Sequence, residues 1–249
     1  MKHLKPKKRL FSKMSTIYQA AKTGDIELLS HLHDEYKLTP VDIRKKDNQV
    51  LRVAAEYGHV HILKYLHQVF HLTAEDARSQ NNYALRAAAE GNHVLVLECL
   101  HDLYGLRDDD ARADNNDVLR CAAWNGYVEV LVCLHDTYQL TSADARAANN
   151  DALKDAFRGD YYKILDCLRN LYGLTIDDIC DSKILKDLAW SGNVQGFAYL
   201  ASTFGVATQH IKAQEVLQCA RLGEHFEQVW QGLCDIYGLT QKDIGLLLD

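Results

Sequence analysis

The sequence is poor in proline and in long apolar runs, and both scarcities narrow the possible structures. Only 2 of its 249 residues are proline and 14 are glycine, which suits a helical chain. No run approaches the roughly 18 apolar residues of a membrane-spanning helix, so no membrane span is expected. The basic start is not followed by the apolar segment of a secretory signal peptide. We therefore expect a helical protein of the cytoplasm.

Signatures of catalysis and of cofactor binding are missing as well. The sequence has no glycine-rich phosphate loop, no H-E-x-x-H and no G-x-S-x-G. Its seven cysteines are an odd number, which favours free thiols in a reducing compartment over a disulfide framework. The motifs thus predict a chain that is not an enzyme and takes no cofactor.

The net charge of −6 is unevenly distributed along the chain. Residues 1–13 contain six basic side chains and no acidic one. Removing these six from the 28 basic residues leaves 22 against 34 acidic ones, a net charge of −12 for the remainder. Such an acidic body repels phosphates and disfavours nucleic acid as a partner. We interpret residues 1–14 as a flexible arm, either a solvated tail or, through Lys5 to Arg9, a short nuclear-import signal or acidic-surface anchor.

One segment, from Asn48 to Arg78, recurs from Ser15 to the end of the chain. Each copy has an apolar residue that opens an L-R-x-A-A pattern, and we call this residue the anchor. The anchors lie 34 residues apart in the first copies and 32 and 31 apart in the last. They are Ile17, Leu51, Leu85, Leu119, Leu153, Leu185 and Val216. A fixed period of this length predicts one repeat domain over residues 15–249, a solenoid of about seven repeats of 31–34 residues.

The periodicity inside one copy is helical. Leu51, Ala54 and Ala55 share a helix face, and Gly58 is expected to end that helix. A second helix follows and closes on an aromatic residue in every copy, which predicts a stacked core. Next comes L-T-x-x-D, where a threonine three residues before an aspartate resembles a capping box, and then an asparagine pair typical of a turn. The predicted fold is all-α, with two antiparallel helices and a short third helix or turn per repeat.

The segment from Leu51 to Leu66 resembles the ankyrin repeat pattern L-H-x-A-A-x-x-G-H-x-x-V-V-x-x-L. The family's T-P is absent, its histidine is replaced by Arg or Lys, and the L-T-x-x-D-A-R segment stands where the family has a β-hairpin. This variant is similar to the divergent repeats of intracellular bacteria such as legionellae and of giant viruses of amoebae. The resemblance implies a monomeric protein that binds another protein on the concave face formed by its first helices.

A basic residue follows the anchor in five consecutive copies: Arg52, Arg86, Arg120, Lys154 and Lys186. This basic column has two interpretations. It forms a stripe that binds an acidic partner, or each side chain pairs with Asp42, Asp76, Asp110, Asp144 or an asparagine of the linking turn. Since a residue repeated in every copy usually serves the repeat, we favour the second interpretation.

Residues that break the repeat pattern are better candidates for recognition. Trp124, Arg158 and Trp190 lie five residues after their anchors, where other copies carry lysine, glutamate or arginine. Tyr57 follows the same position in its copy. Because tryptophan, tyrosine and arginine are enriched in binding hot spots, we predict that these side chains are exposed and contact a partner. The alternative for Trp124 and Trp190 is that they fill a groove between repeats.

Recurring histidines and cysteines suggest a metal site at first sight. His33, His67, His101 and His135 occupy one position of successive copies, as do Cys99, Cys133 and Cys167. Helices in such stacks lie roughly 10 Å apart, which is too far for ligands of one zinc ion or for a disulfide. We therefore predict no metal site.

The sequence leaves three functional hypotheses. The first is a non-catalytic scaffold that binds a protein, and the second is such a scaffold acting as a translocated effector in host cytosol or nucleus. The third is an enzyme whose site is assembled across several repeats. The apolar C-terminal residues Leu246 to Leu248 either cap the last repeat or mark the chain as the binding domain of a longer protein.

Overall fold

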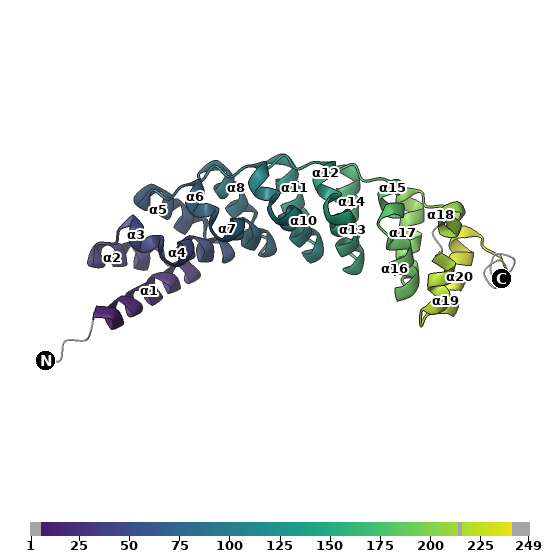
Figure 1. The fold of residues 1–249 in the computed structure, drawn as a ribbon, viewed down its shortest axis with the longest axis horizontal. Coiled ribbons are helices and arrows are strands. Elements are labelled where there is room, and N and C mark those ends of the chain that lie inside the picture. The colour runs from purple at the N-terminus through teal and green to yellow at the C-terminus, as the bar shows by residue number, and fades with distance from the viewer. Residues whose placement is uncertain (1–5, 214–215, 241–249) are drawn as a thin grey trace. The chain divides into compact units, whose positions relative to one another are not determined.

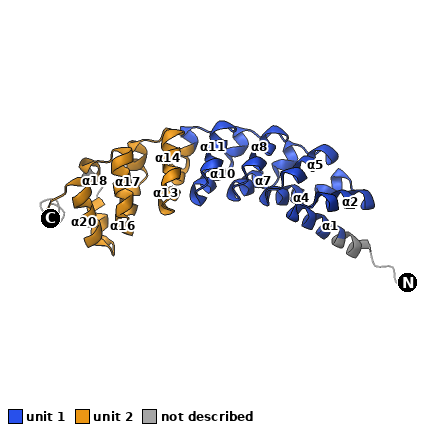
Figure 2. Ribbon diagram, turned by 180° about the vertical axis from the view of Figure 1, so that it is seen from behind, with its two compact units in different colours: residues 1–144 blue, residues 145–249 orange. Residues whose placement is uncertain are grey.

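The computed structural model describes residues 6–213 and 216–240, and that part of the chain contains helices and no strands (Figure 1). The chain divides into two compact units, residues 1–144 and 145–249 (Figure 2). Each unit is a stack of repeats, and each repeat has two antiparallel helices, followed in the first six repeats by a short third one. The prediction of an all-α helical-repeat fold is confirmed.

Unit 1 holds four repeats of three helices each. Their first helices are α1 (Pro6–Thr23), α4 (Lys45–Glu56), α7 (Ser79–Glu90) and α10 (Ala113–Asn125). Their second helices are α2 (Ile26–Tyr36), α5 (Val60–Phe70), α8 (Val94–Asp102) and α11 (Val128–Asp136). Their short third helices are α3 (Pro40–Ile43), α6 (Ala74–Ala77), α9 (Asp108–Ala111) and α12 (Ser142–Ala145), the last of which crosses the unit boundary in the sequence.

Unit 2 continues the same order with three further repeats. Its first helices are α13 (Ala147–Arg158), α16 (Ile184–Ser191) and α19 (Val216–Leu222). Its second helices are α14 (Tyr162–Asn170), α17 (Val194–Phe204) and α20 (Phe226–Tyr237), and its short helices are α15 (Ile176–Asp181) and α18 (Thr208–Ala213).

The predicted helix faces form the core of unit 1. Leu51, Ala54 and Ala55 are completely buried, and α4 packs closely against α1 on one side and α7 on the other. Alanine at these positions lets neighbouring backbones approach, which explains why first helices pack so tightly in this unit. Gly58 follows α4 with a left-handed φ of 78°, as expected for the residue that ends a helix.

The asparagine pairs lie in an unusual kink near the start of a first helix, inside the bounds given above. Three consecutive residues there adopt left-handed φ and ψ angles, for example Gln80, Asn81 and Asn82 in α7. Asparagine tolerates this conformation better than most residues. The Asn82 side chain is buried and its Nδ2 donates to the Asp110 carbonyl at 3.2 Å, so the turn also bonds to the following repeat.

The aromatic residue that closes each second helix lies in the core, as predicted, except in the first repeat. The Tyr104 hydroxyl donates to the Leu63 carbonyl of the preceding repeat at 2.7 Å, and Tyr138 does the same to Leu97 at 2.7 Å. Tyr36 is 42 % exposed. It belongs to the first repeat, and the described residues contain no earlier second helix that would cover it.

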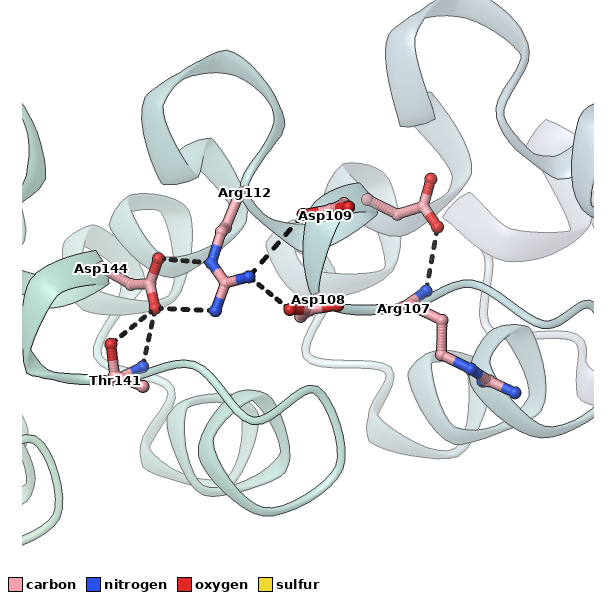
Figure 3. Close-up of polar contacts among 7 residues, drawn as sticks. Arg107, Asp108, Asp109, Arg112, Thr141 and Asp144 are labelled. Carbon is pink, nitrogen blue, oxygen red and sulfur yellow. Dashed lines mark hydrogen bonds and ion pairs between the residues drawn. The ribbon is translucent and has the colours of Figure 1, made fainter.

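The aspartate that caps a short third helix stabilises two repeats at once in four places of the described chain. Within its own repeat the Asp144 carboxylate accepts hydrogen bonds from the Thr141 backbone N–H at 2.7 Å and hydroxyl at 3.0 Å. The same carboxylate accepts from Arg112 Nε of the preceding repeat at 2.8 Å (Figure 3). Equivalent pairs join Arg44 to Asp76, Arg78 to Asp110 and Arg146 to Asp178. We call these four contacts the Arg–Asp pairs.

At low pH, protonation is expected to weaken the contacts of the aspartates that cap the short third helices. A hydrogen bond from Lys45 and those from Thr39 lower the pKa of Asp42 to about 2. Burial raises the pKa of Asp144, but Arg112 and Thr141 more than offset it and leave the pKa lowered. A depressed carboxyl pKa stabilises the fold above the unfolded-state pKa, and the contribution is lost as pH falls through the folded value. The free energy of unfolding should therefore drop between about pH 4 and pH 2.

Urea denaturation at a series of pH values measures this drop. Asp42→Asn removes one titrating group, so its stability should depend less on pH in that range than the stability of the parent chain. Equal slopes in the two proteins would show that Asp42 is not stabilised by its partners.

The expected arm at residues 1–14 differs in part from the structure. Residues 6–14 belong to α1, so this helix begins ahead of the predicted start of the repeats at Ser15. Residues 1–5 lie outside the described residues, and so do Leu246, Leu247 and Leu248. Lys13 lies 5.4 Å from the Tyr36 ring centroid, which ties this end of α1 to the first repeat.

Candidate partner-binding site

Three of the predicted recognition residues lie at the C-terminal ends of first helices. Trp124 is 55 % exposed at the end of α10, and Trp190 is 60 % exposed near the end of α16. Arg158 ends α13 and is exposed as well, with its guanidinium 3.2 Å from the Asp155 carboxylate. Their predicted exposure is confirmed, and their contact with a partner stays a prediction.

Tyr57, the fourth predicted residue, already has a neighbour on its ring. Lys22 of the preceding repeat places its ammonium 5.1 Å from the ring centroid. The hydrogen bond with Tyr57 raises the pKa of Lys22. Tyr57 is therefore less available to a partner than the two tryptophans.

The basic column makes contacts within the linking turns. Arg52 Nε donates to the Asp47 carbonyl at 2.9 Å, and Arg120 Nη2 to the Asp117 carboxylate at 2.7 Å. Arg86 Nη1 lies 3.4 Å from Asp117. The predicted pairing of these arginines with Asp42, Asp76, Asp110 and Asp144 is wrong. Lys45 pairs with Asp42, and the arginines of the Arg–Asp pairs hold the other three carboxylates. The basic column serves the turns, which agrees with the interpretation that it supports the repeat.

Unit 2 contains a pocket that brings Arg158 and Trp190 together. Its volume is about 560 Å³, and it lies between α13 and α16. Lys154, Phe157 and Arg158 line it from α13, and Asp187, Leu188 and Trp190 line it from α16. We call it the α13–α16 pocket. A volume of this size is within the range of ligand-binding pockets, roughly 300–1,000 Å³.

Two large side chains replace alanines of the repeat beside the pocket. Phe157 occupies the position that Ala55, Ala89 and Ala123 hold in unit 1, and Leu188 stands where α4 has Ala54. Both are buried and line the pocket. The backbones of α13 and α16 approach each other at fewer positions than those of α4 and α7.

An aromatic cluster supports the α13 side of the pocket. The rings of Phe157 and Tyr199 meet edge to face with centroids 6.4 Å apart, and Tyr162 lies 4.7 Å from Tyr199. The Tyr199 hydroxyl donates to the Asp166 carboxylate at 2.7 Å. Burial and this carboxylate raise the pKa of Tyr199, so the phenol stays protonated and keeps the donor role. The contact with Tyr199 thus holds the Phe157 ring in its place beside the pocket.

The pocket also contains acidic residues that the sequence interpretation did not select. Asp187 lies two residues after its anchor, where unit 1 has Gln19, Val53, Ala87 and Cys121. Asp187 lines the pocket, and so does Asp160, whose carboxylate accepts from Asn193 Nδ2 at 2.8 Å. The signal that finds Asp187 is the one that found the tryptophans, a departure from the repeat at a fixed distance from the anchor.

The histidines and cysteines are placed one per repeat, as predicted. His67 and His101 pack edge to face against Tyr104 and Tyr138. Cys99 and Cys133 are buried, and burial raises the pKa of each thiol to about 11, which suppresses the reactive thiolate. Within the described part of the chain, no group of three His, Cys, Asp or Glu side chains is arranged to hold a metal ion.

None of the helices that the structure describes has the length and apolar composition needed to cross a membrane. No protein-family model and no curated protein matches the sequence.

Among solved structures, an ankyrin repeat family protein from Legionella pneumophila is similar to this chain. The two sequences are 21 % identical, the similarity covers 95 % of this chain and 79 % of the other, and the TM-score is 0.43. Each repeat described above has two antiparallel helices. A short helix, such as α6 (Ala74–Ala77), stands where the ankyrin pattern that the sequence resembles has a β-hairpin.

Proposed function

We propose that this chain is a non-catalytic scaffold that binds a partner protein through the C-terminal ends of its first helices. The observation that carries the proposal is Trp190, an exposed indole on the rim of the α13–α16 pocket. Exposing a large aromatic ring to water is unfavourable, and such residues are enriched in binding hot spots. Trp124 extends the same argument to unit 1.

The distribution of shifted pKa values favours binding over catalysis. Catalytic groups need shifted pKa values inside a cleft. Among the described residues, the carboxyls with lowered pKa values are Asp42, Asp76, Asp108, Asp144 and Asp178. They pair with lysine or arginine within the repeats, and none of them lines the α13–α16 pocket. An enzyme site assembled across several repeats would need such groups in the pocket, so we place it second.

The test is capture of partner proteins by the immobilised chain, compared between variants. Changing Trp124 and Trp190 together to alanine should reduce recovery of the specific partner at least about tenfold, because hot-spot aromatics contribute most of the binding energy. Melting temperature should stay within about 2 °C, since exposed side chains away from the core contribute little to stability.

Leu95→Ala is the matched control, because Leu95 is exposed on the second helix α8 and lies outside the first-helix ends. It should leave capture unchanged. If the double variant recovers the same proteins as the parent chain, the proposal is wrong. If it melts far lower, the tryptophans are structural.

The effector hypothesis adds a host-cell source for the partner and a host compartment for the protein. It rests on the similarity of the repeats to those of intracellular bacteria and giant viruses, and on the basic segment from Lys5 to Arg9. Capture from a eukaryotic host lysate but not from a lysate of the organism that encodes the chain would support it, and the reverse would favour a scaffold in the cytoplasm of that organism. A longer protein that contains this chain as its binding domain is compatible with either result.

A further inference from the structure

The exposed ring of Trp190 is the first feature that indicates what the pocket binds. Elsewhere the chain places cations over exposed or half-buried rings, with Lys22 5.1 Å from Tyr57 and Arg52 5.1 Å from Tyr83. Among the residues that the structure describes, no lysine or arginine lies over Trp190. Tryptophan is the aromatic side chain that attracts a cation most strongly, by about 0.5–2 kcal/mol.

The charges of the α13–α16 pocket favour a positively charged occupant. Its two cations are neutralised on their own helix, because Lys154 lies 3.0 Å from Asp151 and Arg158 lies 3.2 Å from Asp155. Asp187 lines the pocket and makes no ion pair within the described part of the chain. Asp160 is bonded by the neutral amide of Asn193, so its charge is not compensated either.

The Asp187 carboxylate is not required by the repeat. Its position holds Gln19, Val53, Ala87 and Cys121 in unit 1, and Val53 and Ala87 are buried there. A carboxylate in place of a buried apolar residue gives up packing between first helices. Because Asp187 lines the pocket, this replacement points to a ligand rather than to folding.

From the pocket volume, the uncovered indole and the uncompensated carboxylates, we infer that the α13–α16 pocket binds the cationic side chain of a basic peptide segment in the partner. The ammonium or guanidinium lies against the Trp190 ring, and Asp187 and Asp160 accept its hydrogen bonds. The aliphatic part of the side chain packs on Phe157 and Leu188. This inference rests on the proposed function and names the chemistry that the scaffold recognises.

The test uses four acetylated and amidated peptides that differ at one position. Their sequence is Gly-Gly-X-Gly-Gly, where X is arginine, lysine, citrulline or glutamate. Citrulline has the shape of arginine without its charge. Binding to the full ¹⁵N-labelled chain is followed through the indole N–H resonances of the tryptophans, and Trp190→Phe identifies the Trp190 signal. The arginine or lysine peptide should shift the Trp190 signal, and the citrulline and glutamate peptides should not.

A pair of charge variants separates site-specific binding from general attraction to an acidic protein. Asp187→Asn should weaken binding of the cationic peptide about five- to tenfold, which is typical for loss of one charge-assisted contact. Asp181→Asn removes the same charge from an exposed residue of α15 outside the pocket and should change affinity less than about twofold. Equal effects of the two variants, or equal binding of the arginine and citrulline peptides, would overturn the inference.

The two proposals fail in different ways. If partner capture depends on Trp190 but no cationic peptide shifts its resonance, the scaffold function stands and the inference about the pocket is wrong. If the cationic peptides bind at Trp190 but substitution of both tryptophans leaves partner capture unchanged, the inference about the pocket is supported and the proposed function is wrong.

Discussion

Asp110→Ala should lower the free energy of unfolding by about 3 kcal/mol, near the low end of what breaking a buried ion pair costs. Asp110 is 7 % exposed and accepts hydrogen bonds from Arg78 Nε at 2.7 Å and Nη2 at 3.1 Å. It also accepts from the Arg107 backbone N–H at 2.9 Å, which caps α9. The substitution removes both contacts and leaves the Arg78 guanidinium beside the next repeat without its carboxylate. Arg78 is partly exposed, so water recovers some of the loss.

The adjacent residue is a matched control for this prediction. The Asp109 side chain is 96 % exposed, and its carboxylate lies 3.8 Å from Arg112 Nη1. Asp109→Ala should change the free energy of unfolding by less than about 0.5 kcal/mol. Urea denaturation of the two variants beside the parent chain measures both values. If Asp110→Ala is as mild as Asp109→Ala, the Arg–Asp pairs do not hold neighbouring repeats together.

The Arg–Asp pairs show where prediction from sequence succeeds and where it stops. The hydrogen bond that the Thr73 backbone N–H donates to Asp76 is local, and the spacing of three residues predicts it correctly. The partner of the same carboxylate is Arg44 of the preceding repeat. Sequence patterns assigned the arginine after the anchor to this role, because both arginines recur with the same period. Only the stacking of repeats, which depends on core packing, decides which one reaches the carboxylate.

The candidate site was predictable as a set of unusual residues but not as a pocket. Comparing copies identified Trp190, since it breaks a column of mostly charged side chains, and Arg158 occupies the same position in the preceding copy. Their proximity depends on how far apart α13 and α16 lie. That distance depends on how large side chains such as Phe157 and Leu188 pack between repeats. A periodic pattern gives the positions on each helix and leaves the spacing between helices open.

Gly58→Ala should cost about 3 kcal/mol, for two reasons that add. The residue has a left-handed φ of 78°, which costs a side chain about 1–2 kcal/mol. An added Cβ would also lie 2.7 Å from Nδ1 of His93 in the next repeat. That ring is held in place, because its Nε2 lies 3.1 Å from the Glu56 carbonyl. Moving the ring would break this bond between repeats and add about 1 kcal/mol or more.

Gly105→Ala isolates the backbone contribution. Gly105 has a similar φ of 75°, and an added Cβ would have no atom within 4 Å. This variant should lose only about 1–2 kcal/mol. The difference between the two glycine variants in urea denaturation therefore measures the glycine–histidine contact between repeats. Equal losses would mean that His93 moves aside freely, and that Gly58 is needed only to end its helix, as the sequence alone predicts.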